Sequence, residues 1–153
     1  MKKFRYSMEN LLQVKLKLED QAKLAYSDAR LRLTKEEDKL QALEKRKSSY
    51  EDELRLLRTS RLDLLKIKHC EDAIDIMKHQ IKQQVIAVKN AEQRLEVARI
   101  RLHDAMVERK IQEKLKEKAW EEYLLEFDAE ERKEVDELNS FHFRNPTLSE
   151  EDR

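Results

Sequence analysis

The sequence predicts an all-α protein that folds as a long two-helix antiparallel coiled-coil hairpin. Three observations lead to this prediction. The 153 residues include no glycine and a single proline, Pro146, so the turns that a sheet requires have few residues suited to them. Charged residues make up 43% of the chain, and its heavy use of Ala, Glu, Lys, Leu and Arg is typical of long helices. Apolar residues recur at intervals of three and four, which is the spacing of a coiled-coil seam.

The first helix is expected to span about residues 8–57. Two successive four-residue steps, through Ala25, Ala29 and Leu33, depart from the strict heptad and locally relax a supercoil. The small alanine side chains there predict a close approach of the facing helix. The apolar stripe predicted for the seam consists of Phe4, Met8, Leu11, Leu18, Ala22, Ala25, Ala29, Leu33, Leu40, Leu43, Tyr50, Leu54, Leu57 and Leu64. It has gaps at charged residues, which are Lys15, Glu36, Lys47 and Arg61.

The connection between the helices is expected within residues 58–70. Thr59 and Ser60 are the best candidates for the start of the second helix, with Asp63 following as a partial capping box. The apolar periodicity runs through this region almost in phase. A second arrangement therefore stays open, namely one unbroken helix that pairs with a second copy of the chain.

The second helix is expected to reach about Leu138. The hairpin then forms one domain over residues 1–139, and residues 140–153, which contain the turn signal Asn145-Pro146, are predicted to be a mobile tail. The apolar positions predicted for the seam of this helix are Ile74, Met77, Ile81, Val85, Val88, Ala91, Leu95, Ala98, Leu102 and Ala105.

Charge patterning favours the hairpin over the parallel dimer. The chain has no net charge, but residues 111–153 carry 14 acidic and 7 basic residues. An antiparallel hairpin brings Lys2, Lys3 and Arg5 near the acidic segment 113–137, whereas a parallel dimer sets two acidic ends side by side. Each exposed pair contributes only about 0–1 kcal/mol, so the argument rests on the whole pattern.

Composition also excludes several function classes. A chain without glycine has no Gly-rich phosphate loop. Zero net charge weighs against a nucleic-acid binder. No apolar run has the length of a signal peptide or a spanning helix, so we expect a cytosolic protein without direct membrane insertion. The one cysteine, Cys70, cannot form an internal disulfide, which fits a reducing compartment.

No catalytic, metal or cofactor site is expected, and the protein is predicted not to be an enzyme. His69 and Cys70 are adjacent, so on a helix they point about 100° apart and cannot act as a nucleophile and its base. No two histidines lie three or four residues apart, the spacing that would favour a zinc site. A coiled coil also offers no concave pocket for a substrate.

Two further groups of residues are candidates for contacts. Trp120, Tyr123 and Phe127 share one helical face, and we expect them to pack against Phe4, Tyr6 and Met8. The second group is an apolar row away from the predicted seam, which has nothing within a two-helix coil to cover it and should face a partner. The residues of this off-seam stripe are Ile86, Val97, Ile100, Val107 and Ile111.

Motifs at both ends of the chain resemble those of one known family. The first motif consists of Phe4, Tyr6, Met8-Glu9, Leu11-Leu12, Val14-Lys15, Glu19-Asp20 and Ala22. The second consists of Glu108-Arg109-Lys110, Glu113-Lys114-Leu115, Glu117-Lys118, Tyr123, Glu131, Lys133 and Asp136-Glu137. In this order, and over nearly the whole length, the chain resembles the flagellar type III export protein FliJ family.

The resemblance implies a fold similar to the central stalk of a rotary ATPase. It implies a non-enzymatic component of flagellar protein export that binds the hexameric export ATPase. The other implied partners are the membrane export gate protein and the export chaperones. It also implies a cytoplasmic protein that is peripherally associated with the membrane through the export apparatus.

Site residues follow from the resemblance as well. The implied ATPase-binding residues are Phe4, Tyr6, Met8, Arg109, Glu113, Leu115, Tyr123 and Glu131. The implied export-gate-binding residues are Cys70, Ala73, Ile74 and Met77, although Cys70 departs from the larger apolar residue usual there. Two other functions stay open: a generic homodimeric coiled-coil tether, and a stalk subunit of another secretion or rotary ATPase.

Overall fold

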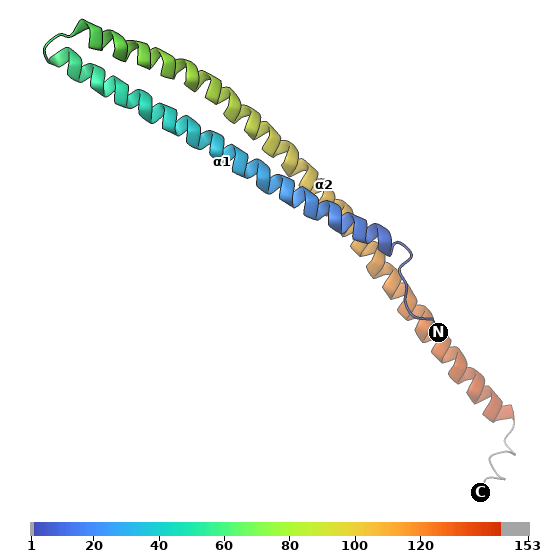
Figure 1. Ribbon diagram of the computed structural model, residues 1–153. Coiled ribbons are helices and arrows are strands. Elements are labelled where there is room, and N and C mark those ends of the chain that lie inside the picture. The colour runs from blue at the N-terminus through green and yellow to red at the C-terminus, as the bar shows by residue number, and fades with distance from the viewer. Residues whose placement is uncertain (1, 145–153) are drawn as a thin grey trace. The chain divides into compact units, whose positions relative to one another are not determined.

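The computed structural model describes residues 2–144, in which two long helices account for all the regular structure (Figure 1). Helix α1 spans Glu9–Thr59 and α2 spans Leu64–Arg144. Within this described range there is no strand, and no residue has a positive φ angle. The predicted fold class, an all-α two-helix antiparallel coiled-coil hairpin, is confirmed.

The connection between the helices, residues 60–63, lies inside the expected interval and excludes the unbroken helix. Asp63 caps α2, because its Oδ1 accepts a hydrogen bond from the backbone N–H of Lys66 at 3.3 Å. The prediction that α2 starts at Thr59 or Ser60 was wrong. The Thr59 hydroxyl donates to the carbonyl of Leu56 at 3.0 Å, so this residue closes the last turn of α1 instead.

The end of α2 also differs from the expectation. The helix continues past Leu138 to Arg144, so the first five residues of the predicted tail, 140–144, are helical. Pro146 chiefly restricts the residue directly before it, and nothing in the preceding sequence breaks a helix. The rest of the predicted tail, residues 145–153, lies outside the described residues.

Tertiary contacts divide the chain into two compact units. The hairpin unit comprises Leu18–Ala105, and the terminal unit comprises Met1–Lys17 and Met106–Arg153, of which residues 2–17 and 106–144 are described. The sequence predicted one domain over residues 1–139 because the apolar periodicity continues without interruption. Periodicity reports local helix geometry and does not show how tertiary contacts are grouped.

In the hairpin unit, α1 and α2 run antiparallel (Figure 1). Ile74, Met77 and Val88 are buried, and the other seam positions of α2 in this unit are buried or half-buried. The predicted gap at Glu36 is filled by a polar contact, because the Gln84 amide donates to both the backbone carbonyl and the carboxylate of Glu36. Such a contact satisfies polar groups that the seam would otherwise leave unpaired.

In the terminal unit the seam has a different phase from the expected one. Leu12 is buried, whereas the predicted seam residue Leu11 is exposed. Two ion pairs join the helices across this seam: Lys15 with Glu108 at 2.7 Å, and Glu9 with Lys116 at 2.9 Å. Lys15, which interrupts the apolar stripe of the first helix, therefore forms an ion pair with the facing helix.

Candidate functional site

The terminal unit contains a cluster of four aromatic rings. The Phe4 ring lies edge-on to Trp120, with ring centroids 5.0 Å apart, and 5.5 Å from the ring of Tyr123. Tyr123 also stacks on Trp120 at 5.5 Å and contacts Phe127 at 6.3 Å. Aromatic pairs of this kind contribute about 0.5–1.5 kcal/mol beyond their buried area. The predicted packing of Phe4 against this face of α2 is confirmed.

Two hydrogen bonds hold the residues that precede α1 against this face. The Tyr123 hydroxyl donates to the backbone carbonyl of Lys2 at 2.9 Å. The Tyr6 hydroxyl donates to Oε1 of the buried Gln112 at 3.1 Å. The structure thus brings together three of the candidate ATPase-binding residues, Phe4, Tyr6 and Tyr123, at one place on α2.

The aromatic cluster is open to solvent on one side and is surrounded by charge. Trp120 is 44% exposed. Beside it, a groove is lined by the basic residues Lys2, Lys3 and Arg5 and by the acidic residues Glu122, Glu126 and Glu130. The predicted proximity of the basic residues before α1 to the acidic segment of α2 is therefore present. An exposed indole within such a charged rim is typical of the anchor of a protein interface.

Beyond the cluster, the end of α2 is exposed on every side. Each residue from Asp128 to Arg144 is exposed. The exposed side chains include four large apolar ones, which are Val135, Leu138, Phe141 and Phe143. Segment 121–137 carries nine acidic and two basic residues. This part of α2 therefore offers apolar and acidic groups to a partner.

The other candidate ATPase-binding residues lie around the cluster. Met8 and Leu115 are exposed, and Glu131 is exposed four residues beyond Phe127. Arg109 pairs with Glu113 on the next turn of α2 at 2.8 Å. The sequence analysis expected Trp120 and Phe127 to pack within the chain and did not include them among the candidate ATPase-binding residues. Their shared helical face with Tyr123 was the available signal.

Glu9 provides a test of the cross-helix pairing in the terminal unit. The hydrogen bond from Lys116 and that from Gln13 lower the pKa of the Glu9 carboxyl below its usual value. The folded protein then binds fewer protons than the unfolded chain as the carboxyl titrates. The stabilisation of the folded protein by the Glu9 carboxylate is therefore complete above the pKa of this group in the unfolded chain. It is lost as the pH falls through the pKa of Glu9 in the folded protein.

Replacing Glu9 with glutamine is expected to lower the melting temperature slightly at pH 7, and this difference should shrink as the pH falls through the folded-state pKa of Glu9. The amide keeps the size of the side chain and removes the charge that attracts Lys116. Thermal denaturation of both proteins between pH 3 and pH 7 measures the difference. A melting-temperature difference that stays constant over this range would contradict the assigned pairing.

The candidate gate-binding residues near the start of α2 are mostly covered. Cys70, Ile74 and Met77 are buried in the seam, and Ala73 is half-buried. Burial, with the nearby carboxylates of Glu53 and Glu71, raises the pKa of the Cys70 thiol. Its S–H group donates to the backbone carbonyl of Tyr50 at 3.0 Å. Cys70 is thus held as a protonated packing residue of the hairpin unit.

Four exposed leucines surround the connection and were missed by sequence reasoning. They are Leu56, Leu62, Leu64 and Leu65, which are 68–77% exposed. Leu64 was expected to continue the seam of α1. Because α1 ends at Thr59, Leu64 instead becomes the first residue of α2. We name these four residues the connection leucines.

The five residues of the off-seam stripe are all exposed. In the hairpin unit these are Ile86, Val97 and Ile100, and in the terminal unit Val107 and Ile111. Exposed aliphatic side chains that recur on one side of a helix are suited to contact with another protein.

The structure offers no metal centre or membrane span within residues 2–144. In this range, no group of three or more His, Cys, Asp or Glu side chains is placed to hold a metal ion. Neither described helix combines the length and the apolar character needed to cross a bilayer.

Comparison with known proteins adds two matches. The family model described as "Flagellar FliJ protein" matches residues 4–148. Among solved structures, a protein from Chlamydia trachomatis described as a homologue of YscO is similar, with a TM-score of 0.69 and 22% sequence identity. That alignment covers 99% of this chain and 100% of the other. No curated protein matches the chain. At this identity the structural likeness supports the fold alone.

Proposed function

Because this chain belongs to the flagellar FliJ protein family, we propose that it is a non-enzymatic coupling factor of flagellar protein export. Members of this family are non-catalytic proteins associated with type III export. In this proposal, the protein binds the hexameric export ATPase and links it to the membrane export gate protein and to substrate chaperones. The observation that carries the proposal is the aromatic cluster that Phe4 forms with α2, in which Trp120 is exposed beside a groove of charged residues.

The ATPase contact is assigned to the terminal unit. Trp120 supplies an exposed aromatic anchor, and Phe4 and Tyr123 fix its position. Met8 and Leu115 extend the apolar surface, and acidic residues such as Glu131 favour a basic partner surface. Buried aromatic anchors surrounded by charged residues are the usual source of binding energy in protein interfaces.

The gate contact is assigned to the connection end of the hairpin unit. Ala73 is the most accessible of the four residues implied by the family resemblance, because Cys70, Ile74 and Met77 are buried. We include the connection leucines in this contact surface, since they lie close in sequence and are largely exposed. A surface that contains several exposed leucines has apolar area to bury against a partner.

The first test measures binding and ATP hydrolysis by the flagellar export ATPase of the source organism, with and without this protein. Co-purification together with a higher hydrolysis rate or ring assembly supports the proposal. A well-folded helical protein that neither binds nor changes hydrolysis contradicts it. A solution mass of twice 18.5 kDa would then favour the homodimeric tether. Binding to a different secretion or rotary ATPase would favour the other stalk function.

We expect the off-seam stripe to contact the ATPase ring as well. Replacing Ile100 and Val107 with glutamate in one variant places two charges on an exposed apolar surface. Stability should change by less than about 0.5 kcal/mol per substitution, because both side chains are partly solvated. ATPase stimulation should fall several-fold. Hydrolysis assays at saturating ATP measure the effect, and unchanged stimulation would remove the stripe from the interface.

A further inference from the structure

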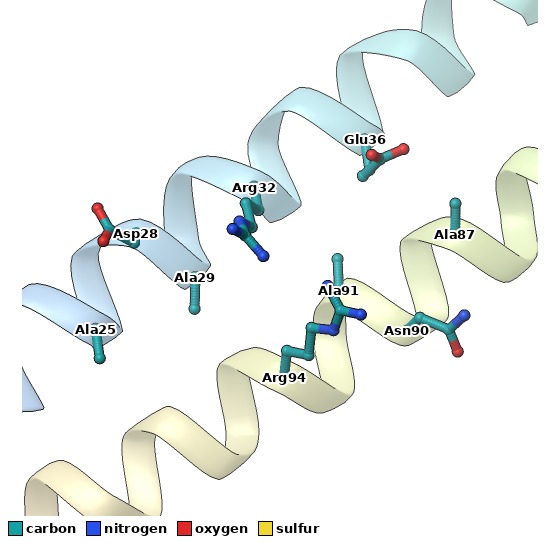
Figure 2. A pocket seen from close by; sticks show the side chains of 9 residues that line it. All are labelled: Ala25, Asp28, Ala29, Arg32, Glu36, Ala87, Asn90, Ala91 and Arg94. Atoms are coloured by element: carbon teal, nitrogen blue, oxygen red, sulfur yellow. The ribbon is translucent and has the colours of Figure 1, made fainter.

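A groove lies along the hairpin unit between α1 and α2 (Figure 2). It has a volume of about 630 Å³. Ala25 and Ala29 line it from α1, and Ala87 and Ala91 line it from α2. The sequence predicted a close approach of the helices at Ala25 and Ala29. The structure instead leaves space here, because an alanine side chain ends at Cβ and does not reach the facing helix.

Two arginines reach this groove from opposite helices. Arg32 of α1 and Arg94 of α2 both line it. In Figure 2 the Arg32 guanidinium lies between the helices, and the Arg94 side chain extends alongside α2 toward Ala91. Neither guanidinium forms an ion pair or a hydrogen bond with any residue in the described range 2–144. Arg94 also lines an adjoining groove of about 780 Å³ together with Arg101, which likewise has no such partner within that range.

Within residues 2–144, neither acidic residue of the lining, Asp28 or Glu36, forms an ion pair with these arginines. The Glu36 carboxylate accepts from Gln84 and lies 3.7 Å from Lys39. Asp28 is the one other acid in the lining of the first groove, so two acids stand against its two arginines. The lining of the adjoining groove adds Arg101 and no acid, so three arginines stand against two acids over the two grooves together. An arginine presents a planar fork of donors that matches a carboxylate. The groove thus combines an apolar floor with two unused carboxylate-binding groups.

We propose that this groove binds an acidic amphipathic helix of a partner protein. A third helix laid along two antiparallel helices would place its apolar side chains over the alanines and its carboxylates beside Arg32 and Arg94. A nucleic acid would gain nothing from the alanine floor, whereas an amphipathic helix can bury apolar side chains on it. This surface goes beyond the proposed function and does not depend on the ATPase or the gate protein.

The test uses the full chain and a fluorescein-labelled helical peptide made of three copies of the heptad Leu-Glu-Glu-Leu-Ala-Glu-Glu. Fluorescence anisotropy at low salt measures the dissociation constant, because screening weakens contacts between exposed charges. Wild-type protein should bind the peptide saturably. The double variant Arg32→Glu/Arg94→Glu should bind at least about tenfold more weakly, since it replaces both cations with like charges.

The matched control is the double variant Arg30→Glu/Lys89→Glu. It makes the same change in net charge on the same two helices, at exposed positions outside the groove lining. Its affinity should lie within about threefold of wild type, which is a small effect on the affinity scale. An equal loss of affinity in both double variants would show that peptide binding depends on net charge alone, and it would overturn the proposal.

Two further measurements complete the test. Ala25→Leu fills the groove from an exposed position without changing any charge, and it should also weaken binding. A peptide with glutamine at every glutamate position should lose most of its affinity. Absence of saturable binding to wild type, or full affinity of the glutamine peptide, would overturn the proposal. Circular dichroism checks that each variant keeps its helices.

Discussion

Replacing Ile74 with aspartate is expected to lower the free energy of unfolding of the hairpin unit by at least about 4 kcal/mol. Ile74 is 7% exposed, and it lies in the seam near the buried side chains of Cys70 and Met77. Truncating a buried aliphatic side chain alone costs about 2–5 kcal/mol. An unpaired carboxylate at the same place adds the cost of burying a charge. Because whole domains are stable by only about 5–15 kcal/mol, much of the unit should lose its helical structure.

The matched variant is Leu64→Asp, one of the connection leucines. Leu64 is 77% exposed, and it is the first residue of α2, where a negative charge interacts favourably with the helix dipole. Its stability should stay within about 0.5 kcal/mol of wild type. Thermal and urea denaturation followed by circular dichroism measure both variants. Equal destabilisation of the two would show that the connection packs differently from the structure.

The same pair of variants separates a structural role from a contact role at the connection end. If the connection leucines bind the export gate protein, Leu64→Asp loses binding while it keeps a normal melting temperature. Loss of binding by Ile74→Asp is expected from unfolding alone, so that variant does not report on contact. Normal gate binding by a folded Leu64→Asp/Leu65→Asp double variant would show that these leucines lie outside the interface.

The seam of α2 could be predicted from the sequence because one periodicity dominates it. Residues from Ile74 to Ala105 follow three- and four-residue steps, and the structure buries or half-buries all ten predicted positions. The aromatic cluster could be predicted in the same way, since rings three and four residues apart must share a helical face. Both predictions needed only the geometry of a single helix.

The exposed surface near the connection could not be predicted in the same way. Whether Leu64 is buried depends on where α1 ends, and periodicity continues through that point without a signal. The boundary is set by one side chain, Asp63, which caps α2. The sequence analysis placed Asp63 three residues after a helix start at Ser60. In the structure Asp63 is itself the N-cap residue of α2.

The alanines show a second limit of the sequence. Small residues permit two helices to approach closely, but they do not require it. The spacing between the helices also depends on larger neighbours, such as the half-buried Tyr26 and Leu33, which fill the seam on either side. Because Ala25 stays exposed, the outcome in this chain is a groove. Sequence alone cannot distinguish these outcomes, since both satisfy the same apolar pattern.

Replacing Trp120 with alanine is expected to weaken ATPase binding by at least about tenfold. The indole is 44% exposed, and it is held in place by the rings of Phe4 and Tyr123. Truncation of such an anchor typically costs 2 kcal/mol or more of binding free energy in the centre of an interface. Titration of the ATPase with each protein, followed by hydrolysis rate and by co-sedimentation, measures the affinity.

Two control variants isolate the contribution of the indole. Leu125→Ala removes an exposed apolar side chain from the same helix, where Leu125 makes none of the ring contacts, and it should bind within about twofold of wild type. Tyr123→Phe removes the hydrogen bond to the Lys2 carbonyl and keeps the ring contacts. It should cost about 0.5–1.5 kcal/mol of stability and leave binding nearly unchanged.

The two controls also define what a negative result would mean. If Trp120→Ala binds as tightly as wild type, the aromatic cluster serves only to hold residues 2–8 against α2, and the ATPase contact lies elsewhere. If Tyr123→Phe loses as much affinity as Trp120→Ala, binding depends on the position of these early residues. In that case, the partner would contact the groove lined by charged residues such as Lys2, Lys3 and Glu126, and its affinity should fall steeply as the salt concentration rises.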